Sequence, residues 1–133
     1  MQQEYKYGEL THRIIGCSME VHRVLGNGFQ EVIYQRSLAY ELEQINVGFA
    51  REVDMPIFYK GILMGTRRAD FLIEEKVMVE LKAIIKLEEV HLAQAINYLE
   101  AYNLEIGLLI NFGASSLEFK RVLNPHFRRF YPK

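Results

Sequence analysis

The sequence RADFLIEEKVMVELK, residues 68–82, decides the fold. Two runs rich in β-branched and other apolar residues flank the charged triplet at 74–76, a pattern typical of a β-hairpin. Each run also carries charged side chains, with Asp70 in the first run and Glu80 and Lys82 in the second. A charged group inside an apolar strand is costly unless it is paired or binds a metal. The hairpin therefore predicts a site as well as a fold.

The alternation of side chains along a strand places Glu80 and Lys82 on one face. If the charged triplet forms the turn, Ile73 pairs with Val77. Asp70 then lies across from Glu80, with roughly 5 Å between directly opposed Cβ atoms. Two carboxylates this close repel each other, and one is protonated at neutral pH unless a cation lies between them. We expect a hard cation held by oxygen atoms, such as Mg²⁺; a hairpin with a purely structural salt bridge is the alternative that the spacing leaves open.

The composition fits one globular domain in a reducing compartment. The chain has 133 residues, half of them hydrophobic and a quarter charged, and we expect residues 1–133 to form a single domain. The single cysteine, Cys17, excludes an intramolecular disulfide and a cysteine-based metal site within one chain. No apolar run approaches the length of a membrane span, so we expect a cytoplasmic protein with no membrane contact. The net charge of −1 argues against strong non-specific binding to nucleic acid.

Hydrophobic periodicity and turn residues predict the element order α-α-β-β-β-α-β-β. Apolar residues at helical spacing predict helices over residues 10–25, 30–44 and 88–103. Apolar and β-branched runs predict strands over residues 49–59, 63–73, 77–84, 105–112 and 117–123. The run at 105–112 is apolar almost throughout, which is typical of a central strand covered on both faces. We therefore expect an α/β fold in which helices flank both faces of a mixed sheet.

Two helix faces carry further polar side chains that could reach the hairpin site. Glu31 and Tyr34 stand three residues apart on the second helix and share a face. Gln94 and Tyr98 stand four residues apart on the third helix, with His91 one turn earlier. Spacing alone favours an ordinary exposed or half-buried helix face in both cases.

Basic residues gather in three short clusters. Arg67 and Arg68 immediately precede the hairpin site, and the others lie at 120–121 and near the end of the chain. Taken alone, each cluster is more typical of solvated surface charge than of a binding patch.

Asp70, followed after nine residues by Glu80-Leu81-Lys82, resembles the core motif of the PD-(D/E)XK nuclease superfamily. Ala69 stands where the superfamily usually has a proline. That motif alone is a weak signal, and its value here comes from what precedes and follows it on the expected elements.

Two helical motifs strengthen the resemblance. Gln94-x-x-x-Tyr98 resembles the Gln-Tyr motif of the RecB-like branch of the superfamily. Gly28-x-x-Glu31-x-x-Tyr34 closely resembles the motif of the GxxExxY family, small proteins placed in the same superfamily. Together the motifs cover most of the chain.

The resemblance implies a restriction-endonuclease-like fold, an αβββαβ core preceded by an extra N-terminal helix. It implies that the metal ligands are Asp70, Glu80, the Leu81 carbonyl and Glu31. Lys82 would position the attacking water or stabilise charge on the phosphate. The catalytic residues that follow are Glu31, Asp70, Glu80, Lys82, Gln94 and Tyr98.

We therefore expect a nuclease that uses Mg²⁺, with Mn²⁺ as a substitute, and hydrolyses phosphodiester bonds in DNA more readily than in RNA. A non-catalytic binding or regulatory module that keeps the fold is the alternative, because fold and motif do not establish activity. A small phosphorylated substrate is a third option. A chain of this size has little surface for gripping a duplex, which suggests a homodimer or a partner protein. The aromatic tail residues either contribute a contact or pack back on the domain; they are Phe127, Phe130 and Tyr131.

Overall fold

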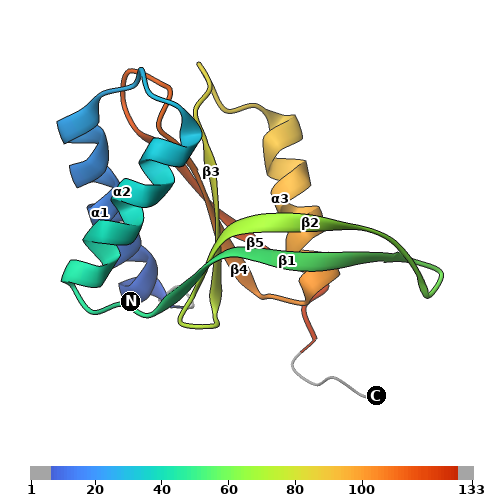
Figure 1. Ribbon diagram of the computed structural model, residues 1–133. Helices are drawn as coiled ribbons and strands as arrows, with labels where there is room; N and C mark the ends of the chain where they lie inside the picture. Colours follow the sequence, from blue (N-terminus) through green and yellow to red (C-terminus); the bar gives the residue numbers. More distant parts are fainter. Residues whose placement is uncertain (1–6, 129–133) are drawn as a thin grey trace, which may run out of the picture.

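The computed structural model describes residues 7–128, which form three helices and one five-stranded sheet (Figure 1). The elements are α1 (Gly8–Leu25), α2 (Glu31–Gln44), β1 (Phe49–Tyr59), β2 (Ile62–Ile73), β3 (Val77–Lys82), α3 (Glu89–Tyr102), β4 (Ile106–Asn111) and β5 (Glu118–Leu123). Their order is the predicted one. The predicted third strand is shorter than expected and ends at Lys82. Of the aromatic tail, Phe130 and Tyr131 lie outside the described residues.

The sheet is mixed, as predicted. Its strand order is β1-β2-β3-β4-β5. The pairs β1–β2, β2–β3 and β4–β5 are antiparallel, whereas β3 and β4 are parallel. Helix α3 connects the two parallel strands, as such a crossover requires. Among the helices described, none combines the length and hydrophobicity that a membrane crossing requires.

Helices cover the sheet from both sides (Figure 1). On one side α1 and α2 pack on the sheet through a core that includes Ile14, Leu38, Val79, Leu81 and Ile110. On the other side α3 packs through a smaller core that includes Met78, Ala95, Leu99, Leu109 and Val122. Successive side chains of β3 and β4 therefore pack alternately into the two cores on opposite faces of the sheet. This is why these two strands are apolar along their length.

Strand β2 changes direction at Asp70. Its ladder with β3 consists of the pairs Ile73–Val77, Leu72–Met78 and Phe71–Val79, so the predicted turn register is confirmed. Beyond this point β1 and β2 continue as a two-stranded ribbon that crosses α3 (Figure 1). The β1–β2 pairing skips Asp70 and Glu52, and Glu52 has a left-handed backbone with φ of 55°.

The bend changes which layer the ribbon faces. Phe71 belongs to the core under α1 and α2, whereas Ala69, two residues earlier, belongs to the core under α3. In a straight strand these two side chains would share a face. Ala69 and Arg67 consequently face α3.

The segment that follows Lys82 is fixed by the end of β4. Asn111 is fully buried, and its side chain accepts a hydrogen bond from the Ile84 N–H (3.0 Å) and donates one to the Ile84 carbonyl (2.9 Å). The backbone of Ile84 also lies against Gly113, where an added Cβ would come within 2.4 Å of its N and O atoms. This contact limits how far the end of β3 can shift.

We predict that Gly113→Ala destabilises the protein by about 1–3 kcal/mol, the usual cost of forcing extra atoms into a packed site. Gly16→Ala is the matched control, because a Cβ at Gly16 on α1 meets nothing within 4 Å. Alanine there should raise the free energy of unfolding by roughly 0.5–1 kcal/mol. Urea unfolding of both variants measures the difference, and equal stabilities would contradict the close packing at Gly113.

Candidate functional site

The carboxylates of Asp70 and Glu80 meet where β2 leaves β3. The Leu81 N–H donates to Asp70 Oδ2 (2.8 Å), and the Asp70 N–H donates to Glu80 Oε1 (3.1 Å). The backbone pairing of β2 with β3 ends at Phe71–Val79. The two carboxylate hydrogen bonds take the place of the backbone hydrogen bonds that the next residue pairs would form. The acidic pair therefore forms part of the junction between the two strands.

The second oxygen of each carboxylate is held by a side chain. Gln35 Nε2 donates to Asp70 Oδ1 (2.8 Å), and Arg67 Nη2 donates to Glu80 Oε2 (2.8 Å). Gln35 and Glu80 are buried, with 6% and 2% of their surfaces exposed. Each carboxylate thus has one oxygen on a backbone N–H and the other on a side chain, which is buried for Gln35 and partly exposed for Arg67.

Burial and the neighbouring Asp70 charge raise the pKa of Glu80 to about 7. Three contacts lower the pKa of Glu80 without cancelling this rise: the charge of Arg67, the hydrogen bond from the Asp70 N–H and the charge of Lys82. Glu80 is therefore held between its neutral and ionised forms near neutral pH, as expected for one member of a close carboxylate pair.

A small hollow, too narrow to hold a water molecule, lies between α3 and the central strands. It is lined by Glu80, Lys82, His91, Gln94, Ala95, Tyr98 and Leu109. Four of the six predicted catalytic residues therefore share one surface. The first turn of α3 is fixed beside it by a capping box, in which His91 Nδ1 accepts a hydrogen bond from the Glu88 N–H (2.9 Å).

Glu31 lies at the edge of this site, as the first residue of α2. Partial burial of its carboxyl, followed by the charge of Asp70, raises its pKa, whereas Lys82 and Arg67 lower it. Glu31 therefore lies within electrostatic range of the acidic pair. Over residues 7–128, however, no three His, Cys, Asp or Glu side chains are close enough together to hold one metal ion.

Leu81 contributes its N–H to the site through Asp70. The predicted use of its carbonyl as a metal ligand stays a prediction. The same holds for the catalytic roles assigned from the sequence to the residues that line the hollow.

Arg67 belongs to the site, although its sequence pattern indicated solvated surface charge. Its guanidinium bonds Glu80 and lies over the ring of Tyr98, 4.6 Å from the ring centre. The bend at Asp70 turns Arg67 toward α3, which strict strand alternation does not anticipate. Tyr98 carries the Arg67 guanidinium on its ring.

Gln35 was also missed. It follows Glu31 by four residues on α2, so the two share a helix face. This spacing was the one signal in the sequence that could have placed Gln35 beside the acidic pair.

Tyr34 of the Gly28-x-x-Glu31-x-x-Tyr34 motif is fully buried and stacks on Phe112, with 4.7 Å between ring centres. Its hydroxyl donates to the Gly26 carbonyl (2.6 Å) and accepts from the Phe29 N–H (3.1 Å). Tyr34 thus anchors the turn between α1 and α2 to the end of β4. This contact fixes the start of α2, and with it Glu31.

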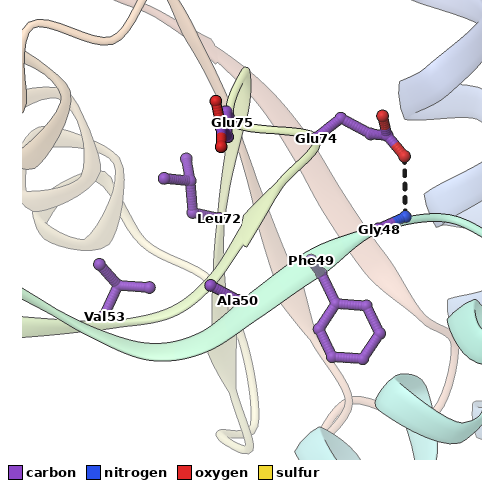
Figure 2. A pocket seen from close by; sticks show the side chains of 7 residues that line it. All are labelled: Gly48, Phe49, Ala50, Val53, Leu72, Glu74 and Glu75. Atoms are coloured by element: carbon purple, nitrogen blue, oxygen red, sulfur yellow. Dashed lines mark hydrogen bonds between the residues drawn. The ribbon is translucent and has the colours of Figure 1, made fainter.

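A wider hollow lies elsewhere, beside the β2–β3 turn (Figure 2). Glu74 accepts a hydrogen bond there from the Gly48 N–H (2.7 Å). None of the predicted catalytic residues is among those that line it, which are Gly48, Phe49, Ala50, Val53, Leu72, Glu74 and Glu75. The acidic pair and this hollow are separate features.

Comparison with solved structures supports the fold assignment. The structure described as "Crystal structure of SSO0001" matches with a TM-score of 0.60 and 19% sequence identity, over 90% of this chain and 60% of that chain. The present chain thus spans about 60% of the length of that protein. At this identity the match shows the fold alone.

A search of curated protein sequences gives no significant match. A model of the PD-(D/E)XK nuclease superfamily, in contrast, matches residues 8–122, a range that contains the acidic pair, Lys82 and the polar residues of α2 and α3. The chain therefore belongs to the PD-(D/E)XK nuclease superfamily, and its mixed five-stranded sheet with helices on both faces is the restriction-endonuclease-like fold.

Proposed function

We propose that this protein is a nuclease that uses Mg²⁺, or Mn²⁺ as a substitute, to hydrolyse phosphodiester bonds, with DNA as the favoured substrate over RNA. The observation that carries the proposal is the junction of β2 and β3. There Glu80 accepts a hydrogen bond from the Asp70 N–H and Asp70 accepts one from the Leu81 N–H, and Glu80 and Lys82 lie beside one hollow.

The same residues support a finer assignment within the superfamily. Gly28, Glu31 and Tyr34 favour the GxxExxY group, and Gln94 with Tyr98 favours the RecB-like branch. A homodimer or a partner protein would supply the additional surface that a duplex requires.

The acidic pair fits a hard divalent cation. Its donors are all oxygen, the ligand type that Mg²⁺ prefers. Burial, and after it the charge of Asp70, raise the pKa of Glu80, and a cation there would favour the ionised carboxylate against both effects. Asp70, Glu80 and the Leu81 carbonyl would hold the ion, with Glu31 contributing negative charge from the edge.

The cation would supply positive charge to a phosphate and make a nearby water easier to deprotonate. Lys82, two residues beyond Glu80 on β3, would add positive charge near the phosphate oxygens, which carry the negative charge of the pentacoordinate transition state. Gln94 lies beside the same hollow and is exposed, so its amide hydrogens could be donated to a phosphate oxygen bound outside the hollow, on the solvent side. These side chains bind and orient the substrate phosphate.

One observation favours the non-catalytic alternative. All four oxygens of Asp70 and Glu80 already accept hydrogen bonds within the chain. A module that keeps the fold for binding alone would retain this closed arrangement and would not take up a cation. Cleavage and cation binding therefore separate the two functions.

We predict that the protein cleaves plasmid or single-stranded DNA in Mg²⁺ or Mn²⁺. Asp70→Asn, Glu80→Gln and Lys82→Met should each lower the rate by a factor on the order of 100 or more, because each removes charge from the site. The measurement is initial cleavage rate, with RNA of the same sequence as a parallel substrate.

Matched controls are available on the same hairpin and just after it. Glu75→Gln removes an exposed carboxylate from the turn, and Lys86→Met removes an exposed ammonium beyond β3. Both should cleave at the wild-type rate. Activity that is equal in the wild type and in all three site variants would identify a contaminating nuclease and remove support for the proposal.

A second prediction concerns pH. Without a divalent cation, the free energy of unfolding should fall as pH rises from 4.5 to about 7. Over this range the folded chain keeps the Glu80 proton that the unfolded chain releases, so the native state binds more protons and loses stability with rising pH. The loss is about 3 kcal/mol at most.

Urea unfolding at several pH values, with a chelator or with saturating Mg²⁺, measures this effect. The decline should be smaller in Mg²⁺, because a cation favours the ionised pair. Glu80→Gln should lack the decline, and Glu75→Gln should keep it. A wild-type pH profile identical to that of Glu80→Gln would show that Glu80 titrates as an ordinary surface glutamate.

A further inference from the structure

The guanidinium of Arg67 occupies a defined place beside the acidic pair. Its Nη2 lies 2.8 Å from Glu80 Oε2, and Nη1 donates to the Arg68 carbonyl (3.0 Å). The guanidinium also lies over the Tyr98 ring, 4.6 Å from its centre. Three contacts from β2, β3 and α3 therefore hold it at Glu80.

The ionised Glu80 carboxylate needs the positive charge of Arg67 beside it. Its side chain is 3% exposed, whereas that of Arg67 is 35% exposed. A buried carboxylate needs a positive partner close by, and removing that partner leaves an uncompensated charge. The partner here is a side chain that reaches solvent and can therefore move away.

The two oxygens of Glu80 differ in how easily they can be released. Oε1 accepts from the Asp70 N–H, which is part of the bent backbone of β2. Oε2 accepts from Arg67, whose rotatable side chain can swing outward. A cation that approaches Glu80 gains access most easily at Oε2, the atom that Arg67 covers.

We infer that Arg67 is a built-in substitute for the divalent cation, a positioning residue that neutralises Glu80 in the cation-free protein and competes with the cation for that carboxylate. This inference rests on the proposed function, because it requires that the acidic pair bind a cation. Two positive charges on one oxygen repel each other, so binding of the ion and release of the guanidinium are coupled. A released guanidinium is suited to a substrate phosphate, which it can bind through two parallel hydrogen bonds.

The test is cation affinity without substrate. Isothermal calorimetry with Mg²⁺, and separately with Mn²⁺, is run on the full-length chain. Arg67→Met keeps much of the side-chain volume and removes the charge. It should bind the cation about tenfold more tightly or better, a difference of about 1.4 kcal/mol. A merely structural role of Arg67 would instead weaken cation binding or leave it unchanged.

Arg68→Met is the matched control. It removes the same charge from the next residue, whose partner Asp54 is exposed. Its cation affinity should stay within about twofold of wild type, because an exposed pair is screened by solvent. Arg67→Lys keeps the charge and should also resemble wild type.

Thermal unfolding gives a second readout that does not depend on calorimetric heat. In chelator, Arg67→Met should unfold at a lower temperature than wild type, and saturating Mg²⁺ should narrow the gap. Unchanged or weaker cation binding in Arg67→Met, or equal tightening in Arg68→Met or Arg67→Lys, would overturn the inference.

DNA cleavage by the wild-type protein distinguishes this failure from a failure of the proposed function. Mg²⁺-dependent cleavage together with unchanged cation affinity in Arg67→Met would overturn the inference and leave the proposed function intact. Absence of both cation binding and cleavage in wild type would overturn the inference and the proposed function together.

Discussion

The structure depends on two hydrogen bonds at the point where two strands separate: Glu80 accepts one from the Asp70 N–H, and Asp70 accepts one from the Leu81 N–H. When β2 turns away from β3, the N–H groups of Asp70 and Leu81 lose the partners that a continued ladder would give them. A buried N–H without a partner costs free energy comparable to a lost hydrogen bond. The two carboxylates supply the missing acceptors. The same charged residues that are unusual in apolar strands are therefore the ones that allow the strands to part.

Placing two carboxylates at this junction brings negative charges close together, and side chains from the neighbouring strands offset them. Asp70 and Glu80 repel each other, and Glu31 adds a third negative charge at the edge. Arg67 and Lys82 offset them from β2 and β3, so the positive charges are local in a chain whose net charge is only −1. The weak overall charge is therefore compatible with a site that handles phosphate, because what matters there is the arrangement of charge within a few side chains.

The order of the elements and the hairpin register could be predicted because they depend on local signals. A charged triplet between apolar runs defines the turn, and the turn fixes which residues pair. The position of Arg67 could not be predicted in this way. Strand alternation assumes a straight strand, whereas β2 bends at the skipped pair of Glu52 and Asp70, so that Ala69 and Arg67 face α3.

The helix residues show a similar limit. Gln35 is a polar residue among helical neighbours, and its partner Asp70 lies 35 positions away in the sequence. Nothing local indicates that it is buried. The pattern around Tyr34 suggested a half-buried side chain, whereas the ring is enclosed by its stack on Phe112. The burial of Gln35 and that of Tyr34 both depend on how α2 packs on the sheet, which is a tertiary property.

The four oxygens of Asp70 and Glu80 differ in their partners, since two accept from backbone N–H groups and two from side chains. Under the proposed function, this difference would let one pair of carboxylates serve both structure and chemistry. Asp70 Oδ2 and Glu80 Oε1 hold backbone N–H groups, so they cannot be released without reopening the junction. Asp70 Oδ1 holds the buried side chain of Gln35, whereas Glu80 Oε2 holds that of Arg67, which is partly exposed and can rotate outward. The oxygens held by backbone N–H groups therefore keep the fold. Under the proposed function, Glu80 Oε2 is the oxygen that would exchange Arg67 for a cation, and this exchange would need the movement of one partly exposed side chain.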